Sequence, residues 1–194
     1  MEIPLFPLRT VLFPGGPLPL RIFESRYLDM ISDCMKSESP FGVLLIREGQ
    51  EVGPVTTHDV GTLARITDWY QGSDGLLGVT AAGEQRFRLL SARQQADGLN
   101  IGEIEILAAE PYMALPPEYA SLKKILESVL DDLGRLYESL ERRYDDAVWV
   151  TYRLIEILPI DLEQKQQLLE SSDTLARLKL IDGLMNTVRG PATG

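Results

Sequence analysis

Hydrophobic and polar residues follow two different patterns along this chain, and the pattern changes near residue 116. Before this point, short apolar runs and alternating segments are separated by glycine and proline, as in strands joined by tight turns. After it, apolar residues recur every three or four positions, which indicates amphipathic helices. We therefore predict an α+β chain with a β lobe over residues 1–115, a helical lobe over 116–190 and a flexible tail over 191–194.

Several segments of the first lobe have the composition of strands. Residues 4–23 place prolines among large apolar side chains, and because proline in a strand forfeits a hydrogen bond, we expect short, interrupted or edge strands there. Residues 41–46 and 60–70 predict buried strands. The Asp-Gly pairs at 74–75 and 97–98 predict hairpins. Repeated strands joined by tight turns favour an antiparallel, barrel-like sheet over βαβ units.

The β lobe also contains one predicted amphipathic helix. Its apolar positions fall on one face and are Tyr27, Met30, Ile31, Cys34 and Met35. We expect Ser25 to be the N-cap of this helix and Asp29 to lie in its first turn, where an acidic side chain is favourable. Further along, Gly83 is expected to turn the chain between two strands.

The helical lobe begins with a long predicted helix over residues 117–143, which has a proline in its first turn. Its apolar residues are spaced alternately by three and four, at Tyr119, Leu122, Leu126, Val129, Leu133, Leu136 and Leu140. Two interpretations stay open, a helix packed against its neighbours or a coiled-coil arm that forms a homo-oligomer. Three further helices are predicted over 145–157, from Asp161, and from Asp173 or Thr174.

Composition and charge exclude several classes of function. The 194 residues carry a net charge of −10, which argues against binding to nucleic acid or to an anionic membrane. One cysteine and one histidine cannot form a disulfide framework or a Cys/His zinc site within one chain. No apolar run approaches the roughly 20 residues that span a bilayer, and the first residues lack the features of a signal peptide. We expect a cytoplasmic protein without a metal or cofactor.

Motifs for catalysis are absent from the sequence. It contains no G-x-x-x-x-G-K-[ST] phosphate loop and no G-x-S-x-G nucleophile segment, so we predict no catalytic residues. His58 is expected in an exposed polar loop. The aspartate pairs at 131–132 and 145–146 are expected on solvated surfaces, because adjacent helical residues do not face the same side. Arg86 and Arg88 are expected on one strand face, where the pair could meet an anion.

Five segments in order resemble the LON domain, the N-terminal substrate-binding domain of Lon-type ATP-dependent proteases. The most specific is PLFPLRTVLFPGGPLPLRIFESRYLDM, and the others are FGVLLIREGQEVG, VGTLARI, GEQRFRLL and LPIDLEQKQQLLE. The resemblance implies a PUA-like β-barrel lobe followed by a helical bundle. It also implies binding of unfolded or tagged polypeptides in a protease or chaperone system. The ATPase and the Ser–Lys peptidase of Lon proteases lie downstream of this domain, so we expect an adaptor or regulatory role without either activity.

A binding site is expected near the start of the first helix. The candidate peptide- or ligand-binding residues are Arg21, Phe23, Glu24, Arg26, Tyr27 and Trp69. Edge strands interrupted by proline could accept an added strand from a peptide. Glu24 and Arg26 could instead form an ion pair that fixes the junction. A different class of function also stays open, a small-molecule sensor or enzyme with a pocket between the two lobes.

Overall fold

The computed structural model describes residues 1–51, 55–138 and 140–189, with residues 188 and 189 described by their backbone alone. The chain divides into two compact units, Met1–Ala109 and Glu110–Gly194, so the boundary lies six residues before the predicted position of 115. The tail predicted at 191–194 lies outside the described residues.

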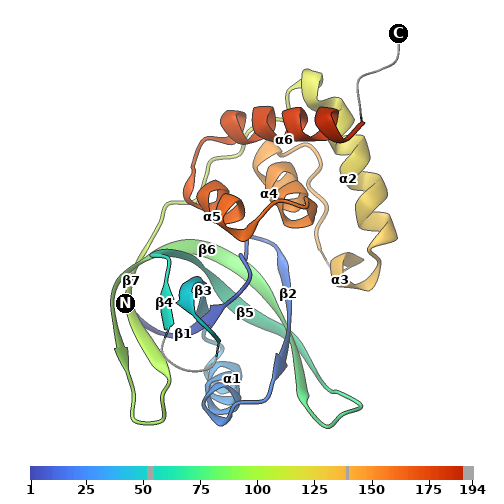
Figure 1. Cartoon of the computed structure of the whole chain (residues 1–194). Coiled ribbons are helices and arrows are strands. Elements are labelled where there is room, and N and C mark those ends of the chain that lie inside the picture. Colours follow the sequence, from blue (N-terminus) through green and yellow to red (C-terminus); the bar gives the residue numbers. More distant parts are fainter. Residues whose placement is uncertain (52–54, 139, 190–194) are drawn as a thin grey trace. The chain divides into compact units, whose positions relative to one another are not determined.

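The strands of the first unit close into a barrel (Figure 1). Their bounds are β1 Glu2–Leu8, β2 Pro17–Ile22, β3 Phe41–Gly49, β4 Val55–Thr57, β5 Val60–Gln71, β6 Leu77–Gln94 and β7 Asn100–Ile106. The sheet order β1-β7-β6-β5-β3-β4 closes because β1 also pairs with β3. This last pairing is parallel and is the exception to the predicted antiparallel sheet, since the chain crosses over through β2 and a helix between the two strands.

Turns and glycines fix the path of the longest strands. Both Asp-Gly pairs lie in the predicted hairpins, with φ of +82° at Gly75 and +87° at Gly98. The turn predicted at Gly83 is wrong, because β6 runs through it without a break over 18 residues. A Cβ atom at Gly83 would lie 2.3 Å from the carbonyl oxygen of Phe13. Glycine is needed here for the close approach of a second chain segment.

Helix α1, Ser25–Ser37, packs its predicted apolar face into the barrel core. The buried side chains of this face are Tyr27, Met30, Ile31 and Cys34, whereas Met35 is exposed. The predicted N-cap is wrong: Glu24 occupies this position, its side chain accepts no capping hydrogen bond from the helix backbone, and the first turn contains no acidic residue. The first turn of this helix is therefore held by contacts other than a side-chain cap, the buried Tyr27 among them.

The second unit is helical, but its first helix is shorter than predicted. The bounds are the 3₁₀ helix η1 Pro117–Tyr119, then α2 Ala120–Asp132, α3 Arg135–Glu138, α4 Ala147–Ile157, α5 Leu162–Glu170 and α6 Thr174–Arg189. The continuous helix predicted over 117–143 is wrong, because the chain turns at Gly134, where φ is +58°. Leu133, on the predicted stripe, is 45% exposed. The apolar stripe therefore forms no uninterrupted coiled-coil arm.

Helix α4 lies at the centre of this unit and contacts α2, α5 and α6. Helices α4 and α5 each begin after an aspartate whose side chain caps the first turn. Asp146 accepts a hydrogen bond from the Val148 amide at 3.0 Å, and Asp161 accepts one from the Gln164 amide at 2.7 Å. Each bond satisfies a backbone donor that the first helical turn leaves free.

A buried carboxylate joins three segments of the helical unit. Glu110 accepts hydrogen bonds from Arg177 and Tyr152, and from the Thr174 hydroxyl at 2.8 Å. Arg177 is fully buried, and its guanidinium also donates to the Ser171 carbonyl oxygen at 2.8 Å. Burial alone raises the pKa of Glu110, but the hydrogen bonds from Arg177 and Tyr152 outweigh it and hold the pKa below its usual value.

Candidate functional site

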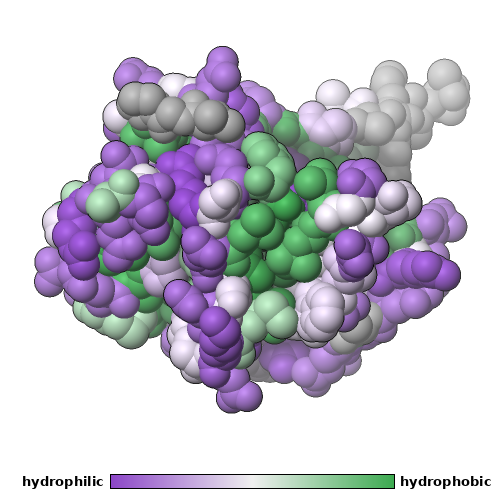
Figure 2. Space-filling model, turned by 90° about the horizontal axis from the view of Figure 1, so that it is seen from below, coloured by the Kyte–Doolittle hydropathy of each residue, from purple (hydrophilic) through white to green (hydrophobic). Residues whose placement is uncertain are grey.

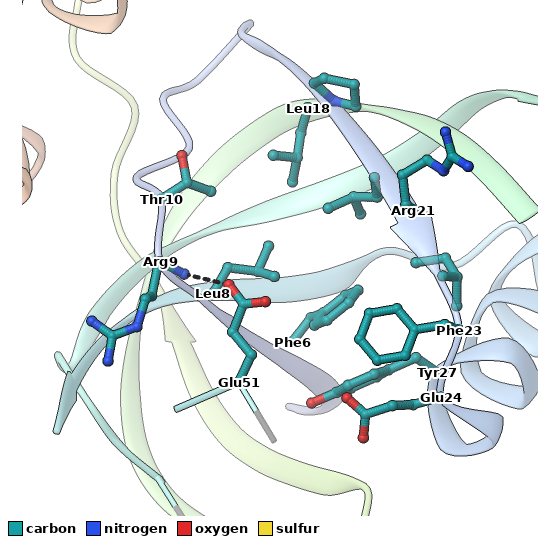
Figure 3. Close-up of a pocket in the computed structure, with 13 residues that line it drawn as sticks. Phe6, Leu8, Arg9, Thr10, Leu18, Arg21, Phe23, Glu24, Tyr27 and Glu51 are labelled. Carbon is teal, nitrogen blue, oxygen red and sulfur yellow. Dashed lines mark hydrogen bonds between the residues drawn. The ribbon is translucent and has the colours of Figure 1, made fainter. Parts of the chain in front are cut away.

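A groove of about 350 Å³ lies in the β unit beside strand β2 (Figure 3). Its apolar lining comes from β1, β2, α1 and the residue that follows β2, and consists of Phe6, Leu8, Leu18, Pro19, Leu20, Ile22, Phe23 and Tyr27. Figure 3 shows the rings of Phe6, Phe23 and Tyr27 near one end of the groove and Leu18 near the other. The groove therefore offers an apolar floor with aromatic side chains gathered at one end.

The aromatic end is built from side chains with very different exposure. The rings of Phe6 and Tyr27 are stacked with their centroids 4.0 Å apart, and both are buried. Burial is the main cause that raises the pKa of Tyr27, so its hydroxyl stays protonated at neutral pH. Phe23 follows β2 directly and is 61% exposed. An exposed ring beside buried rings is suited to cover an incoming apolar side chain.

Charged residues surround the groove in equal numbers of each sign. Of the charged side chains that the described part of the chain brings to the groove, Arg9 and Arg21 are positive and Glu24 and Glu51 are negative. Arg21 forms an ion pair with Asp74, and the Arg9 amide donates to the Glu51 carboxylate at 3.0 Å. The rim therefore favours neither an anionic nor a cationic ligand.

Arg26 does not line the groove but contacts Glu24 and Tyr27, which do. Its guanidinium pairs with Glu24 at 2.9 Å and donates to the Gly98 carbonyl oxygen at 2.8 Å. It also lies over the Tyr27 ring, 4.7 Å from the centroid. The predicted ion pair between Glu24 and Arg26 is thus present, and the hydrogen bond to Gly98 joins the start of α1 to the β6–β7 hairpin.

Apolar side chains also gather on the molecular surface. Figure 2 shows them in the middle of one face, surrounded by hydrophilic residues. Contiguous exposed apolar surface of this kind usually marks an interaction site.

Comparison with known proteins assigns the fold to a family. The family model for the ATP-dependent protease La (LON) substrate-binding domain matches residues 2–187, which is nearly the whole chain. This chain belongs to the LON substrate-binding domain family. A crystal structure of a Lon N-terminal domain protein from Xanthomonas campestris superposes with a TM-score of 0.77 at 36% identity, covering 94% of this chain and 98% of that one.

Curated relatives of this LON domain are much longer proteins. A Lon protease from Anaeromyxobacter dehalogenans is 26% identical over 96% of this chain, which corresponds to 23% of the relative. Protein cereblon from Xenopus tropicalis is 30% identical over 63% of this chain and 27% of its own length. The chain thus spans about a quarter of the length of these relatives. The resemblance drawn from the sequence motifs is confirmed, as is the α+β fold.

The LON domain gathers four of the six predicted site residues around one groove, namely Arg21, Phe23, Glu24 and Tyr27. Arg26 is not part of the groove lining, and Trp69 lines a separate hollow of about 450 Å³ with Arg65. The prediction missed Leu8, Arg9 and Glu51, among others. Glu51 follows β3 by two residues, and no local pattern connects it with β1.

The other candidate residues, His58, Arg86 and Arg88, do not line the groove. The exposed position predicted for His58 is wrong, because this side chain is only 7% exposed between β4 and β5. Arg86 is buried whereas Arg88 is exposed and lies 3.8 Å from Glu105, so the two do not present a common anion site. Among the described residues, no cluster of three or more His, Cys, Asp or Glu side chains is suited to a metal ion.

Within residues 1–51, 55–138 and 140–189, none of the helices has the length and apolar character needed to cross a bilayer.

Proposed function

We propose that the groove beside β2 binds apolar segments of polypeptides, and that the chain acts as an adaptor or regulator without ATPase or peptidase activity. The observation that supports this most is the apolar floor with exposed Phe23 at its edge, in a family described as substrate-binding. A protease or chaperone system that receives the bound polypeptide belongs to the same proposal. The cytoplasmic location and the absence of nucleic-acid partners stay predictions.

The size of the groove sets the affinity that we expect. A volume of about 350 Å³ lies near the small end of ligand pockets and suits one or two side chains of a segment. Burial of two large apolar side chains contributes roughly 3–6 kcal/mol. Because association costs offset part of this gain, we expect a Kd no tighter than about 40 μM. Weak, reversible binding of this kind suits recognition of many different unfolded segments.

The balanced rim predicts that binding depends little on salt. Arg21 and Arg9 are exposed, and surface ion pairs contribute at most about 1 kcal/mol. We expect the Kd for a reduced and carboxymethylated lactalbumin to change less than about twofold between 0.05 and 0.5 M NaCl, in contrast to charge-driven binding. Fluorescence anisotropy of the labelled unfolded protein measures this. A steep loss of affinity with salt would show that charged residues, not the apolar floor, hold the ligand.

Phe23→Ala tests the groove directly. We expect a Kd about tenfold weaker for the same probe, because the variant removes the exposed aromatic surface that covers the bound side chain. The matched control is Leu90→Ala, which removes a 57% exposed side chain on β6 that does not line the groove. Equal effects of the two variants, or no saturable binding by the native chain, would contradict the proposal.

A further inference from the structure

Prolines determine which backbone groups of β2 face the groove. In an antiparallel pair, opposite residues alternate between those that exchange two hydrogen bonds and those whose N–H and C=O groups point to the other edge. Pro17 and Pro19 have no N–H and so cannot exchange two bonds with β6. Leu18 and Leu20, which lie opposite Ala81 and Val79, therefore hold β2 to β6.

The free edge of β2 is consequently poor in donors. Its backbone groups come from Pro17, Pro19 and Arg21, and of these only Arg21 has an N–H. This edge borders the groove, since residues of β1 and β2 line the groove and, in the part of the chain described, none comes from β6. Figure 3 shows β2 along one wall, across from Arg9 and Glu51.

The opposite wall has the same property. Pro4 lies opposite Ile101 of β7 and has no N–H, so its neighbours Ile3 and Leu5 make the bonds to β7. Pro7 lies two residues after Leu5, so its backbone groups are directed to the same side of β1, away from β3. Pro7 has no N–H and therefore offers no donor on this side. The next residue whose N–H is directed to this side is Arg9, and this N–H already donates to the Glu51 carboxylate at 3.0 Å. Both walls thus present carbonyl oxygens and few N–H groups.

We propose that the groove recognises its polypeptide by side chains and not by adding a strand to the sheet. This inference rests on the proposed function. Strand addition needs alternating donors and acceptors along the receiving edge. Pro7, Pro17 and Pro19 supply no N–H along the two edges, and Pro19 lines the groove itself. The expected substrates are then apolar segments that bind whatever the pattern of their backbone N–H groups, and segments that contain proline are among them. The same prolines keep the edge from pairing with a second copy of the chain.

Backbone-modified peptides test this with the native chain. The probe is a ten-residue, fluorescein-labelled fragment of carboxymethylated lactalbumin that binds the native chain and loses affinity with Phe23→Ala. Two derivatives keep every side chain but carry N-methyl groups at odd or at even positions, so each blocks hydrogen bonding along one edge of an extended peptide. We expect both derivatives to bind within about threefold of the parent peptide in anisotropy titrations.

Each outcome has a distinct meaning. A loss of tenfold or more for either derivative would overturn recognition by side chains while leaving the proposed function intact. If no fragment binds with a dependence on Phe23, the proposed function fails and this inference fails with it. Threefold agreement among the three peptides supports the inference.

Discussion

Arg177→Ala is expected to lower the free energy of unfolding of the helical unit by about 3–5 kcal/mol. The variant removes the guanidinium that pairs with Glu110 and leaves this carboxylate almost fully buried without its main partner. It also removes the bond to the Ser171 carbonyl oxygen and the contact with the Tyr152 ring. Urea unfolding followed by circular dichroism at 222 nm measures the change, because this signal reports mainly on helices.

The control for this variant lies on the same helix. Lys179 is exposed on α6, and Lys179→Ala should change the free energy of unfolding by less than about 0.5 kcal/mol. If Arg177→Ala were equally mild, the buried pair would contribute no more than a surface charge.

The same carboxylate predicts how stability depends on pH. The folded state lowers the pKa of Glu110, so the stabilisation is present above the pKa of the unfolded chain, about 4.5, and is lost as pH falls through the lower folded value. We expect native stability to decrease below about pH 4.5 and Glu110→Gln to remove part of that decrease. Urea unfolding midpoints between pH 3 and 7 measure it. A parallel pH dependence in Glu110→Gln would assign the acid sensitivity to other carboxyl groups.

Phe87→Ala is expected to destabilise the β unit by about 3–5 kcal/mol. Phe87 is fully buried among Ile3, Leu5, Leu44, Leu63 and Ile104. Its ring tip occupies space that two glycines leave open, since a Cβ atom at Gly42 or Gly61 would lie 2.8 or 2.9 Å from its Cζ atom. Because backbone atoms border this space, it cannot collapse fully when the ring is removed.

Two further variants make this second prediction specific. Leu90→Ala on the same strand removes an exposed side chain and should cost less than about 0.5 kcal/mol. Gly42→Ala should destabilise the native chain but recover part of the loss in Phe87→Ala, because its methyl group enters the vacated space. Urea unfolding followed by tryptophan fluorescence measures this in a Trp149→Phe background, where Trp69 on β5 is the remaining tryptophan and reports on the β unit. If the losses in free energy of unfolding from Gly42→Ala and Phe87→Ala simply add, the methyl group at residue 42 does not enter the space that the Phe87 ring leaves.

Local patterns predicted the parts of this fold that depend on local physics. Asp-Gly pairs marked both hairpins, and the spacing of Tyr27, Met30, Ile31 and Cys34 marked the buried face of α1. The apolar stripe of the first long helix was a poorer guide, because the turn at Gly134 interrupts it while the spacing continues. Apolar residues spaced by three and four do not by themselves show that the backbone stays helical between them.

The groove was predictable only in part for a related reason. Arg21, Phe23, Glu24 and Tyr27 lie within seven residues, so one local junction brings them together. Glu51 reaches the groove through pairing between strands far apart in sequence, and Trp69 points to another hollow because of where β5 lies in the sheet. Edge strands rich in proline were expected, but which edge the prolines face follows only from the register of β2 on β6.

The only cysteine of the chain gives the β unit a built-in chemical reporter. Cys34 is buried on the inner face of α1, and burial raises the pKa of its thiol, so a disulfide reagent reacts with it mainly when this unit opens. The rate of thiol labelling under native conditions therefore measures the opening of one unit alone. Phe87→Ala should accelerate labelling and Arg177→Ala should leave it unchanged, which separates the motions of the barrel from those of the helices without any added probe site.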